Sequence, residues 1–359
     1  FYQADTRQPL EAFLPRLDTL TFQEQLGSML DKTERLEELT PEIAAMLGLE
    51  DDAVATAAAA AHLCKADLAT QMVVEFTSLQ GVMGREYALK SGHSPEVARA
   101  IFEHYLPRSA GGDHPQTGAG LAVGLADRLD SLAGLFAVGL APTGSADPYG
   151  LRRGALGVVQ NLIAAERPFS ISEGLAAAAR LLAVEVSAEA LEEAQVFVVG
   201  RLRVLLRDRG FPYDIVEAVI NARGDDPYRA QVAVEQLGEW VEREDWPVIL
   251  DNYARCVRIT RGVEETYTLD PGRFVQPAEE ALYEAYLEAN ARVTPESTVD
   301  EFLTAFLPMV DVIDHFFARE SGVLVMAEDE ALRENRLALL QHVAALADGI
   351  VDLSQLEGF

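Results

Sequence analysis

The 359-residue sequence has only two cysteines and no long apolar run. Cys64 and Cys256 form no CxxC pair, so the sequence predicts neither a disulfide framework nor a zinc site, and we expect a cytoplasmic protein. No apolar run approaches the roughly 18 residues that a membrane span needs, so no membrane association is expected. The chain opens with FYQADTRQPL, without an initiator methionine or a secretory signal pattern, and we expect a piece of a longer protein.

Positive charge is also scarce. The chain has 29 Lys and Arg residues against 58 Asp and Glu residues, which gives a formal net charge of −29. This excess argues against indiscriminate binding to nucleic acid or to a membrane surface. If the chain contacts RNA, it must do so where arginines are grouped.

The familiar nucleotide and hydrolase motifs are missing. The sequence contains no GxxxxGK[ST] loop, no GxGxxG after a strand, no GxSxG and no HExxH. We therefore expect no catalytic residue and no bound cofactor in this chain.

Helical periodicity dominates what is present. The segment FQEQLGSMLDKTERLEEL places Phe22, Leu26 and Leu30 at helical spacings, and the Gly-rich apolar stretch GAGLAVGLADRLDSLAGLFAVGL predicts a central buried helix. The predicted fold class is all-α. Stretches near residues 145, 225 and 274 are the candidate linkers. Later helices are expected over 187–209, 212–223, 227–242, 245–261, 277–295, 299–318 and 328–348.

The pattern of residues 22–140 resembles the HD superfamily of metal-dependent phosphohydrolases. Such enzymes need imidazole and carboxylate ligands that converge from several helices, so that the metal activates water against a phosphoester. Asp67 stands at the Asp of the His-Asp doublet, but Ala66 replaces the His; His104 and Asp127 match later ligand positions. The site is therefore degenerate, and we expect no metal at Asp67, His104 and Asp127.

Two longer stretches are more specific, EFTSLQGVMGREYA and PTGSADPYGLRRGALG. Together with FYQAD, QLGSMLDKTERL, CKADLATQ, EHYLPRSAGGD, LADRLDSLAGLFAVGLA and VMAEDEALRENRLALL, in this order, they resemble the C-terminal half of the beta subunit of bacterial heterotetrameric glycyl-tRNA synthetase. That family reads KxDL where HD hydrolases have His-Asp, as CKADL does here.

This resemblance implies a subunit of glycine–tRNA ligase in an α2β2 heterotetramer. The implied partners are tRNA(Gly) and the alpha subunit, and ATP and Mg²⁺ are expected at the alpha subunit. The implied architecture is an HD-like helical domain over 1–155, a helical linker domain over 156–235 and a helical DALR-type anticodon-binding domain over 236–359.

Grouped cations are the candidate tRNA contacts, because each phosphate contact with Lys or Arg releases a counterion. Arginine planes and amides also suit unstacked bases. Arg255, Arg258 and Arg261 recur every three residues on one helix, and Arg333 and Arg336 are three apart on another. The candidates are Lys32, Arg35, Arg152, Arg153, Arg255, Arg258, Arg261, Arg333, Asn335 and Arg336.

The residues themselves leave three hypotheses open. The first is the tRNA-binding part of a glycyl-tRNA synthetase beta subunit. The second is an HD-type metal-dependent phosphohydrolase with a helical extension, against which Ala66 counts. The third is an acidic helical interaction scaffold, against which the ordered series of motifs counts.

Overall fold

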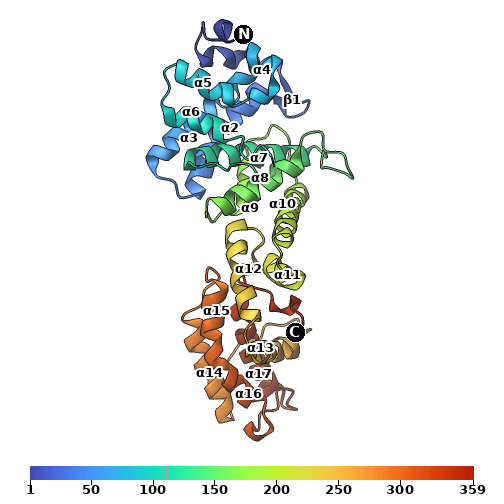
Figure 1. Cartoon of the computed structure of the whole chain (residues 1–359). Helices are drawn as coiled ribbons and strands as arrows, with labels where there is room; N and C mark the ends of the chain where they lie inside the picture. Colours follow the sequence, from blue (N-terminus) through green and yellow to red (C-terminus); the bar gives the residue numbers. More distant parts are fainter. Residues whose placement is uncertain (110) are drawn as a thin grey trace. The chain divides into compact units, whose positions relative to one another are not determined.

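The structure, a computed structural model, describes residues 1–109 and 111–359 (Figure 1). Helices form almost all of its regular structure, and the one sheet in these residues is the short antiparallel pair of β1 and β2, so the all-α fold class is confirmed. The residues form two compact units. The N-terminal unit comprises 1–202 and 225–228, and the C-terminal unit comprises 203–224 and 229–359. The three predicted domain ranges stay a prediction.

The elements follow one another closely along the chain. The strands are β1 (Thr21–Gln23) and β2 (Gly27–Ser28). The α-helices are α1 (Tyr2–Asp5), α2 (Met29–Met46), α3 (Asp51–Leu63), α4 (Gln71–Glu75), α5 (Val82–Lys90), α6 (Pro95–Glu103), α7 (Gly118–Ala137), α8 (Leu151–Ala164), α9 (Ile171–Ala179), α10 (Ala188–Asp208), α11 (Tyr213–Arg223), α12 (Pro227–Val241), α13 (Trp246–Thr260), α14 (Pro277–Asn290), α15 (Val299–Phe306), α16 (Val310–Phe317) and α17 (Glu330–Ala344).

Helix α7 forms the centre of the N-terminal unit. It packs against α2, α3, α6, α8 and α9, and its leucines at positions such as Leu125, Leu129 and Leu132 are fully buried (Figure 1). The prediction of a central buried helix in this Gly-rich stretch is therefore confirmed. Because α7 is surrounded by other helices, polar side chains on it must find partners inside the unit.

The start of α2 differs from the prediction. Residues 22–28, which were expected to be helical, lie in the β1–β2 hairpin instead, and α2 begins at Met29. The reason is a capping box: the Ser28 Oγ accepts the backbone N–H of Asp31 at 3.1 Å, and the Asp31 carboxylate accepts that of Ser28 at 2.6 Å. This cap fixes the register in which α2 presents its polar residues to α7.

The C-terminal unit has an aromatic core. Phe302, Phe306 and Phe316 are fully buried, and Tyr253 packs edge-on against the first two. The helix predicted over 299–318 is divided into α15 and α16 by a 3-10 turn at Leu307–Met309, where Pro308 has no N–H to donate. This break bends the segment around the core.

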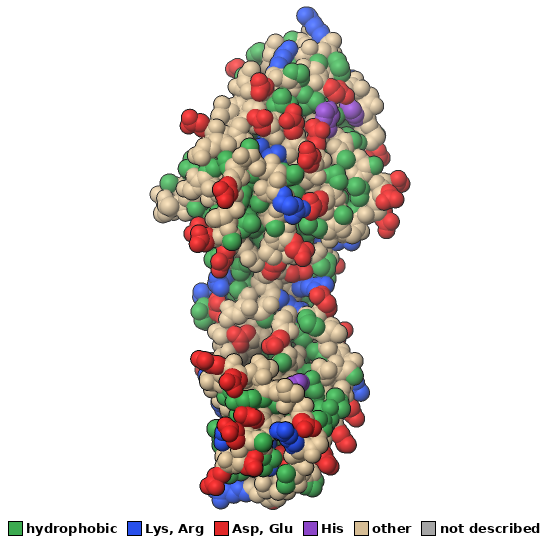
Figure 2. All heavy atoms as spheres, turned by 180° about the vertical axis from the view of Figure 1, so that it is seen from behind, with side chains coloured by type: hydrophobic (Ala, Val, Ile, Leu, Met, Phe, Trp, Pro, Cys, Tyr) green, Lys and Arg blue, Asp and Glu red, His purple; other side chains and the backbone are tan. Residues whose placement is uncertain are grey.

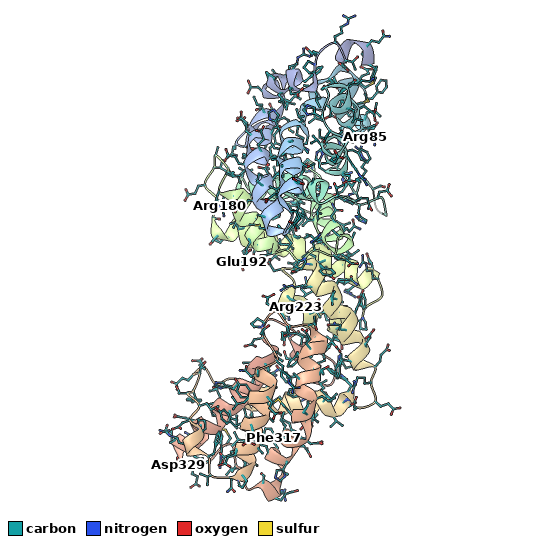
Figure 3. All side chains as sticks on the ribbon, turned by 90° about the vertical axis from the view of Figure 1, so that its left-hand side faces the viewer. Arg85, Arg180, Glu192, Arg223, Phe317 and Asp329 are labelled. Atoms are coloured by element: carbon teal, nitrogen blue, oxygen red, sulfur yellow. The ribbon has the colours of Figure 1, made fainter. Side chains whose placement is uncertain are left out.

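Loops of the C-terminal unit are tied to α11. The guanidinium of Arg223, labelled in Figure 3, donates to the carbonyl oxygens of Ser297 at 2.9 Å and Gly349 at 2.9 Å.

Throughout the part of the chain that the structure describes, none of the helices has the length and hydrophobicity of a membrane span.

We expect Gly81→Ala to destabilise the N-terminal unit. Gly81 has φ +74°, and a Cβ there would overlap the ring of Tyr105. The free energy of unfolding should fall by about 2–5 kcal/mol, measured by urea denaturation. Gly154→Ala is the matched control, because nothing lies within 4 Å of its added Cβ in helix α8. Gly154→Ala should raise the free energy of unfolding by about 0.5–1 kcal/mol. Equal changes in the free energy of unfolding for the two substitutions would contradict this explanation.

Candidate functional site

A network of buried charges joins three of the unusual sequence stretches in the N-terminal unit. The Nζ of Lys32 on α2 donates to Asp130 Oδ2 at 2.7 Å and lies 3.1 Å from Asp127 Oδ1, both on α7. Arg35, one turn further along α2, donates from its Nε to Asp130 Oδ1 at 2.6 Å. The third cation, Lys65, comes from the CKADL segment after α3, and its Nζ lies 2.8 Å from Asp127 Oδ2.

Lys65 lies between two of the three degenerate HD positions. Its Nζ contacts the Nε2 of His104 at 3.1 Å as well as Asp127, and lies 4.4 Å from the centre of the Tyr105 ring. His104 donates from Nδ1 to the carbonyl oxygen of Ile101 at 2.6 Å, so its Nε2 is free to accept from Lys65. Burial and the Lys65 ammonium hold the pKa of His104 well below its usual value, which keeps the ring neutral.

Asp67, the remaining degenerate position, serves another purpose. Its Oδ2 accepts the backbone N–H groups of Gly81 at 2.6 Å and Gly84 at 2.9 Å, at the start of α5. Burial raises the pKa of the Asp67 carboxyl to about 6, against the opposing effect of these two hydrogen bonds. Asp67 thus fixes the EFTSLQGVMGREYA stretch.

The three HD positions therefore do not form a ligand set. An ammonium group occupies the space between His104 and Asp127, and Asp67 binds backbone amides, so this donor set does not fit a divalent metal. Among residues 1–109 and 111–359, no three His, Cys, Asp or Glu side chains are grouped so as to hold a metal ion.

The carboxylates of the network stay ionised. Burial would raise the pKa of Asp127, but the ammonium groups of Lys65 and Lys32 outweigh it and hold that pKa well below its usual range. Burial also acts to raise the pKa of Asp130, but the nearby charges of Lys32 and Arg35 outweigh it and lower that pKa. Three cations face two carboxylates, so the network has a net charge of +1.

The prediction that Lys32 and Arg35 contact tRNA does not agree with this placement. Their side chains are only 3% and 9% exposed, and their donors bind Asp130 and neighbouring acceptors. They hold α2 to α7 and present no free face. Sequence reasoning failed here because an i,i+3 cation pair on an amphipathic helix does not reveal that carboxylates lie opposite it on another helix.

Lys65 is the residue of this network that sequence reasoning missed. It stands in the quoted CKADL segment, directly before Ala66. A lysine within an otherwise apolar stretch, beside a doublet that has lost its histidine, was the available signal.

Arg152 and Arg153, at the start of α8, have different surroundings. The guanidinium of Arg152 donates to the carbonyl oxygen of Gly144 at 2.7 Å, whereas Arg153 is exposed and lines a cleft of about 600 Å³. Asp147 accepts the backbone N–H groups of Leu151 and Arg152 at 2.8 and 3.0 Å and so holds this helix start. His104, Tyr105 and Asp127 line the same cleft.

The arginine stripe on α13 is partly neutralised. Arg255 pairs with Asp251 at 2.8 Å and Asp314 at 2.9 Å. Arg258 and Arg261 are exposed, and their guanidinium carbons lie 5.5 and 5.8 Å from the centre of the Phe359 ring. Arg258 also lies 3.6 Å from Asp251. Arg258, Arg261 and the phenyl ring therefore form one surface group, which we call the Arg258–Phe359–Arg261 cluster.

The α17 candidates lie mostly inside the C-terminal unit. Arg336 is 4% exposed; its Nε donates to Glu279 Oε1 at 2.9 Å. The Asn335 amide pairs with the backbone of Asp270, accepting its N–H at 2.7 Å and donating to its carbonyl at 3.1 Å. Arg333 is partly exposed, 3.7 Å from Glu330. The polar role expected for Asn335 is thus structural, and contact of Asn335 or Arg336 with RNA does not fit their burial.

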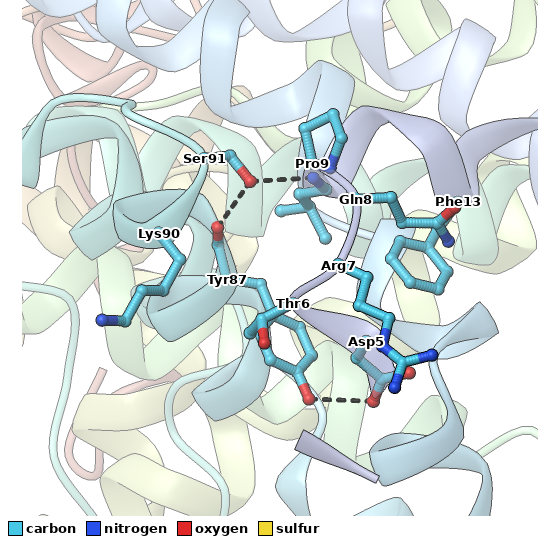
Figure 4. A pocket seen from close by; sticks show the side chains of 10 residues that line it. Asp5, Thr6, Arg7, Gln8, Pro9, Phe13, Tyr87, Lys90 and Ser91 are labelled. Atoms are coloured by element: carbon cyan, nitrogen blue, oxygen red, sulfur yellow. Dashed lines mark hydrogen bonds between the residues drawn. The ribbon is translucent and has the colours of Figure 1, made fainter. Parts of the chain in front are cut away.

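A second pocket, of about 250 Å³, lies between the N-terminal segment and α5 (Figure 4). Two hydrogen bonds cross its wall: Tyr87 donates to Asp5 at 2.9 Å, and Ser91 donates to the Tyr87 carbonyl at 2.7 Å. These hydrogen bonds anchor the N-terminal segment.

Figure 2 shows acidic side chains scattered over one face of both units, where cationic side chains are fewer.

Comparison with known proteins supports the resemblance. A family model described as glycyl-tRNA synthetase beta subunit matches residues 1–221. The glycine–tRNA ligase beta subunit of Moorella thermoacetica is 40% identical over 365 residues, covering 99% of this chain and 52% of that protein. The beta subunit of a Picosynechococcus species is 38% identical, covering 97% of this chain and 52% of that protein.

A plant protein is similar as well. The Arabidopsis thaliana glycine–tRNA ligase named chloroplastic/mitochondrial 2 is 37% identical over 361 residues, covering 100% of this chain and 34% of that protein. The chain therefore spans about half the length of the bacterial beta subunits that it matches, and about a third of the plant protein.

The raised pKa of Asp67 predicts a pH dependence of stability. Because the folded-state pKa, about 6, lies above the ordinary value of 3.8, this carboxyl favours the folded state most below pH 3.8. That contribution is lost as the pH rises through about 6. The free energy of unfolding of the native protein, relative to Asp67→Asn, should therefore fall by about 2–3 kcal/mol between pH 4 and pH 8. A difference that stays constant with pH in urea titrations would refute the assignment.

The burial of Arg336 predicts a structural effect rather than a change in RNA recognition. Arg336→Met leaves Glu279 buried without its cation and should lower the free energy of unfolding by about 3–5 kcal/mol. Arg333→Met, which removes a partly exposed arginine of the same helix, should cost less than about 1 kcal/mol. Denaturant unfolding compares the two. An Arg336 variant of native stability with altered tRNA discrimination would show that our structural assignment is wrong.

Proposed function

The chain belongs to the glycyl-tRNA synthetase beta subunit family, and from this membership we propose that it is a tRNA-binding part of that subunit. In this proposal it positions tRNA(Gly) for aminoacylation by the alpha subunit. The observation that carries the proposal is the Arg258–Phe359–Arg261 cluster on the C-terminal unit.

This cluster has the chemistry that single-stranded RNA requires. Two guanidinium groups offer donors and charge to phosphate, and the phenyl ring with the guanidinium planes offers stacking surfaces to unpaired bases. Arg255 contributes less, because Asp251 and Asp314 already balance its charge. The predicted anticodon-binding domain over 236–359 contains the whole cluster, which supports contact with the anticodon arm.

The N-terminal unit contributes a scaffold in this proposal. We propose that residues 1–155 form an HD-like helical domain whose metal chemistry has been replaced by the Lys65 network, followed by a helical linker over 156–235. The HD phosphohydrolase hypothesis is disfavoured, because Lys65 occupies the space between His104 and Asp127.

Catalysis belongs to the alpha subunit in this proposal. Glycine, ATP and Mg²⁺ bind there, and the two kinds of subunit assemble as an α2β2 heterotetramer. This assignment is drawn from the family resemblance.

Replacing both arginines of the cluster should weaken tRNA(Gly) binding. Each phosphate contact contributes about 0.7–0.9 to the slope of log K against log salt. We expect Arg258→Ala with Arg261→Ala to flatten this slope by about 1.4–1.8 if both side chains contact phosphate. Filter binding of tRNA(Gly) at several salt concentrations measures it.

The matched control removes the same charge elsewhere in the C-terminal unit. Arg292 and Arg319 are exposed and have no carboxylate within ion-pair distance among the described residues. The Arg292→Ala, Arg319→Ala protein should keep the native slope. Equal slopes for the cluster variant, the control and the native chain, all folded by circular dichroism, would rule out the cluster as the tRNA contact.

A further inference from the structure

The cleft of about 600 Å³ in the N-terminal unit is lined by three arginines, Arg108, Arg128 and Arg153. Asp127 is the one carboxylate among its lining residues, so these side chains sum to a charge of +2. In a chain with a net charge of −29, this concentration of positive charge needs an explanation.

Two of these arginines are held in place by backbone carbonyls. Arg108 donates from Nη1 to the carbonyl oxygen of Ser78 at 3.1 Å and from Nη2 to that of Gln80. Arg128 donates from Nη1 to the carbonyl oxygen of His104 at 2.9 Å and from Nη2 to that of Leu106 at 2.6 Å. A carbonyl dipole orients a guanidinium without cancelling its charge, so both remain strong attractants for an anion.

The donors of this cleft are not all satisfied. The Nε of Arg108 is buried and has no hydrogen-bond partner. Arg153 is exposed at the first turn of α8. Among the described residues, none of the three arginines has a carboxylate within ion-pair distance. The Arg108 guanidinium lies 5.4 and 5.5 Å from the centres of the Phe102 and Tyr105 rings, so the donors that an acceptor in the cleft can reach are chiefly those of the exposed Arg153.

Two other residues that line the cleft, Asp127 and His104, do not repel an anion. Asp127, the one acidic residue of the cleft, is balanced by Lys65 at 2.8 Å and Lys32 at 3.1 Å. Burial and Lys65 keep His104 uncharged. An aromatic side chain, Tyr149, stands at the edge, 40% exposed and packed edge-on against Phe22. It offers an accessible ring beside the arginines.

We propose that this cleft binds a nucleotide phosphate, with Arg108, Arg128 and Arg153 facing the phosphate oxygens and the base stacking on Tyr149. Guanidinium forks suit phosphate geometry, and base stacking on an aromatic ring is worth about 1–3 kcal/mol. Lys65 holds the position between His104 and Asp127, so the cleft binds the phosphate without cleaving it. The nucleotide is either a free mononucleotide or one residue of bound tRNA, and the second case rests on the proposed function.

The first arm of the test uses small probes. Inorganic phosphate and adenosine 5′-monophosphate are titrated calorimetrically into the chain at low salt. Arg153→Ala should weaken both by about tenfold or more, because it removes charge-assisted hydrogen bonds. Tyr149→Ala should weaken the mononucleotide and leave inorganic phosphate unchanged. Arg167→Ala, which removes another exposed arginine of the same unit outside the cleft, should change neither.

The second arm uses tRNA(Gly) and separates the two sources. Displacement of the mononucleotide by tRNA(Gly), together with a salt slope flattened by about 0.7–0.9 in Arg153→Ala, identifies a tRNA phosphate. Binding of the mononucleotide that tRNA(Gly) does not displace identifies a free nucleotide.

The inference is overturned if neither small probe binds saturably and Arg153→Ala leaves the affinity and salt slope for tRNA(Gly) unchanged. It is also overturned if Arg167→Ala weakens the probes as much as Arg153→Ala does. A failure of the proposed tRNA-binding function alone gives another pattern of results. In that case the Arg258 and Arg261 substitutions leave the affinity and salt slope for tRNA(Gly) unchanged, while the mononucleotide still binds in the cleft.

Discussion

Asp127 and Asp130, two carboxylates on the central helix α7 of the N-terminal unit, must be neutralised. The placement of α2 and of the segment after α3 against α7 depends on that requirement. A buried charge is tolerated only with a partner. Asp130 takes Lys32 and Arg35 from α2, and Asp127 shares Lys32 and takes Lys65 from the segment after α3. These contacts fix two neighbouring segments against α7. The DKTER, CKAD and ADRLDS stretches are parts of one electrostatic network.

The same network explains why the three degenerate HD positions do not form a set of metal ligands. With Ala66 in place of the doublet histidine, Lys65 supplies positive charge between His104 and Asp127. Asp67, relieved of any role as a ligand there, accepts two backbone N–H groups at the start of α5. Lys65 pairs with Asp127 at this position, so the donor set that a divalent metal needs is gone.

The sequence was informative about elements and poor at assigning partners. Helical periodicity and caps predicted the all-α class, the buried central helix and most later helices to within a few residues; Pro308 and the Ser28 capping box explain the two clearest differences. Arg153, Arg258 and Arg261 could be selected as candidates because grouped arginines are visible in a sequence; the structure leaves all three exposed, and their contact with tRNA stays a prediction. Lys32, Arg35, Asn335 and Arg336 were misjudged, because the carboxylates and backbone groups that engage them are distant along the chain.

The most direct test of the account is the titration of His104. Ring resonances of a histidine-labelled chain are followed by NMR from pH 5 to 8, with His104 assigned through His104→Gln. We predict that His104 stays neutral throughout this range and that Lys65→Met raises its pKa, because the adjacent ammonium is removed. A native His104 that titrates near its ordinary value of 6.5, unchanged by Lys65→Met, would contradict the claim that Lys65 occupies the degenerate site.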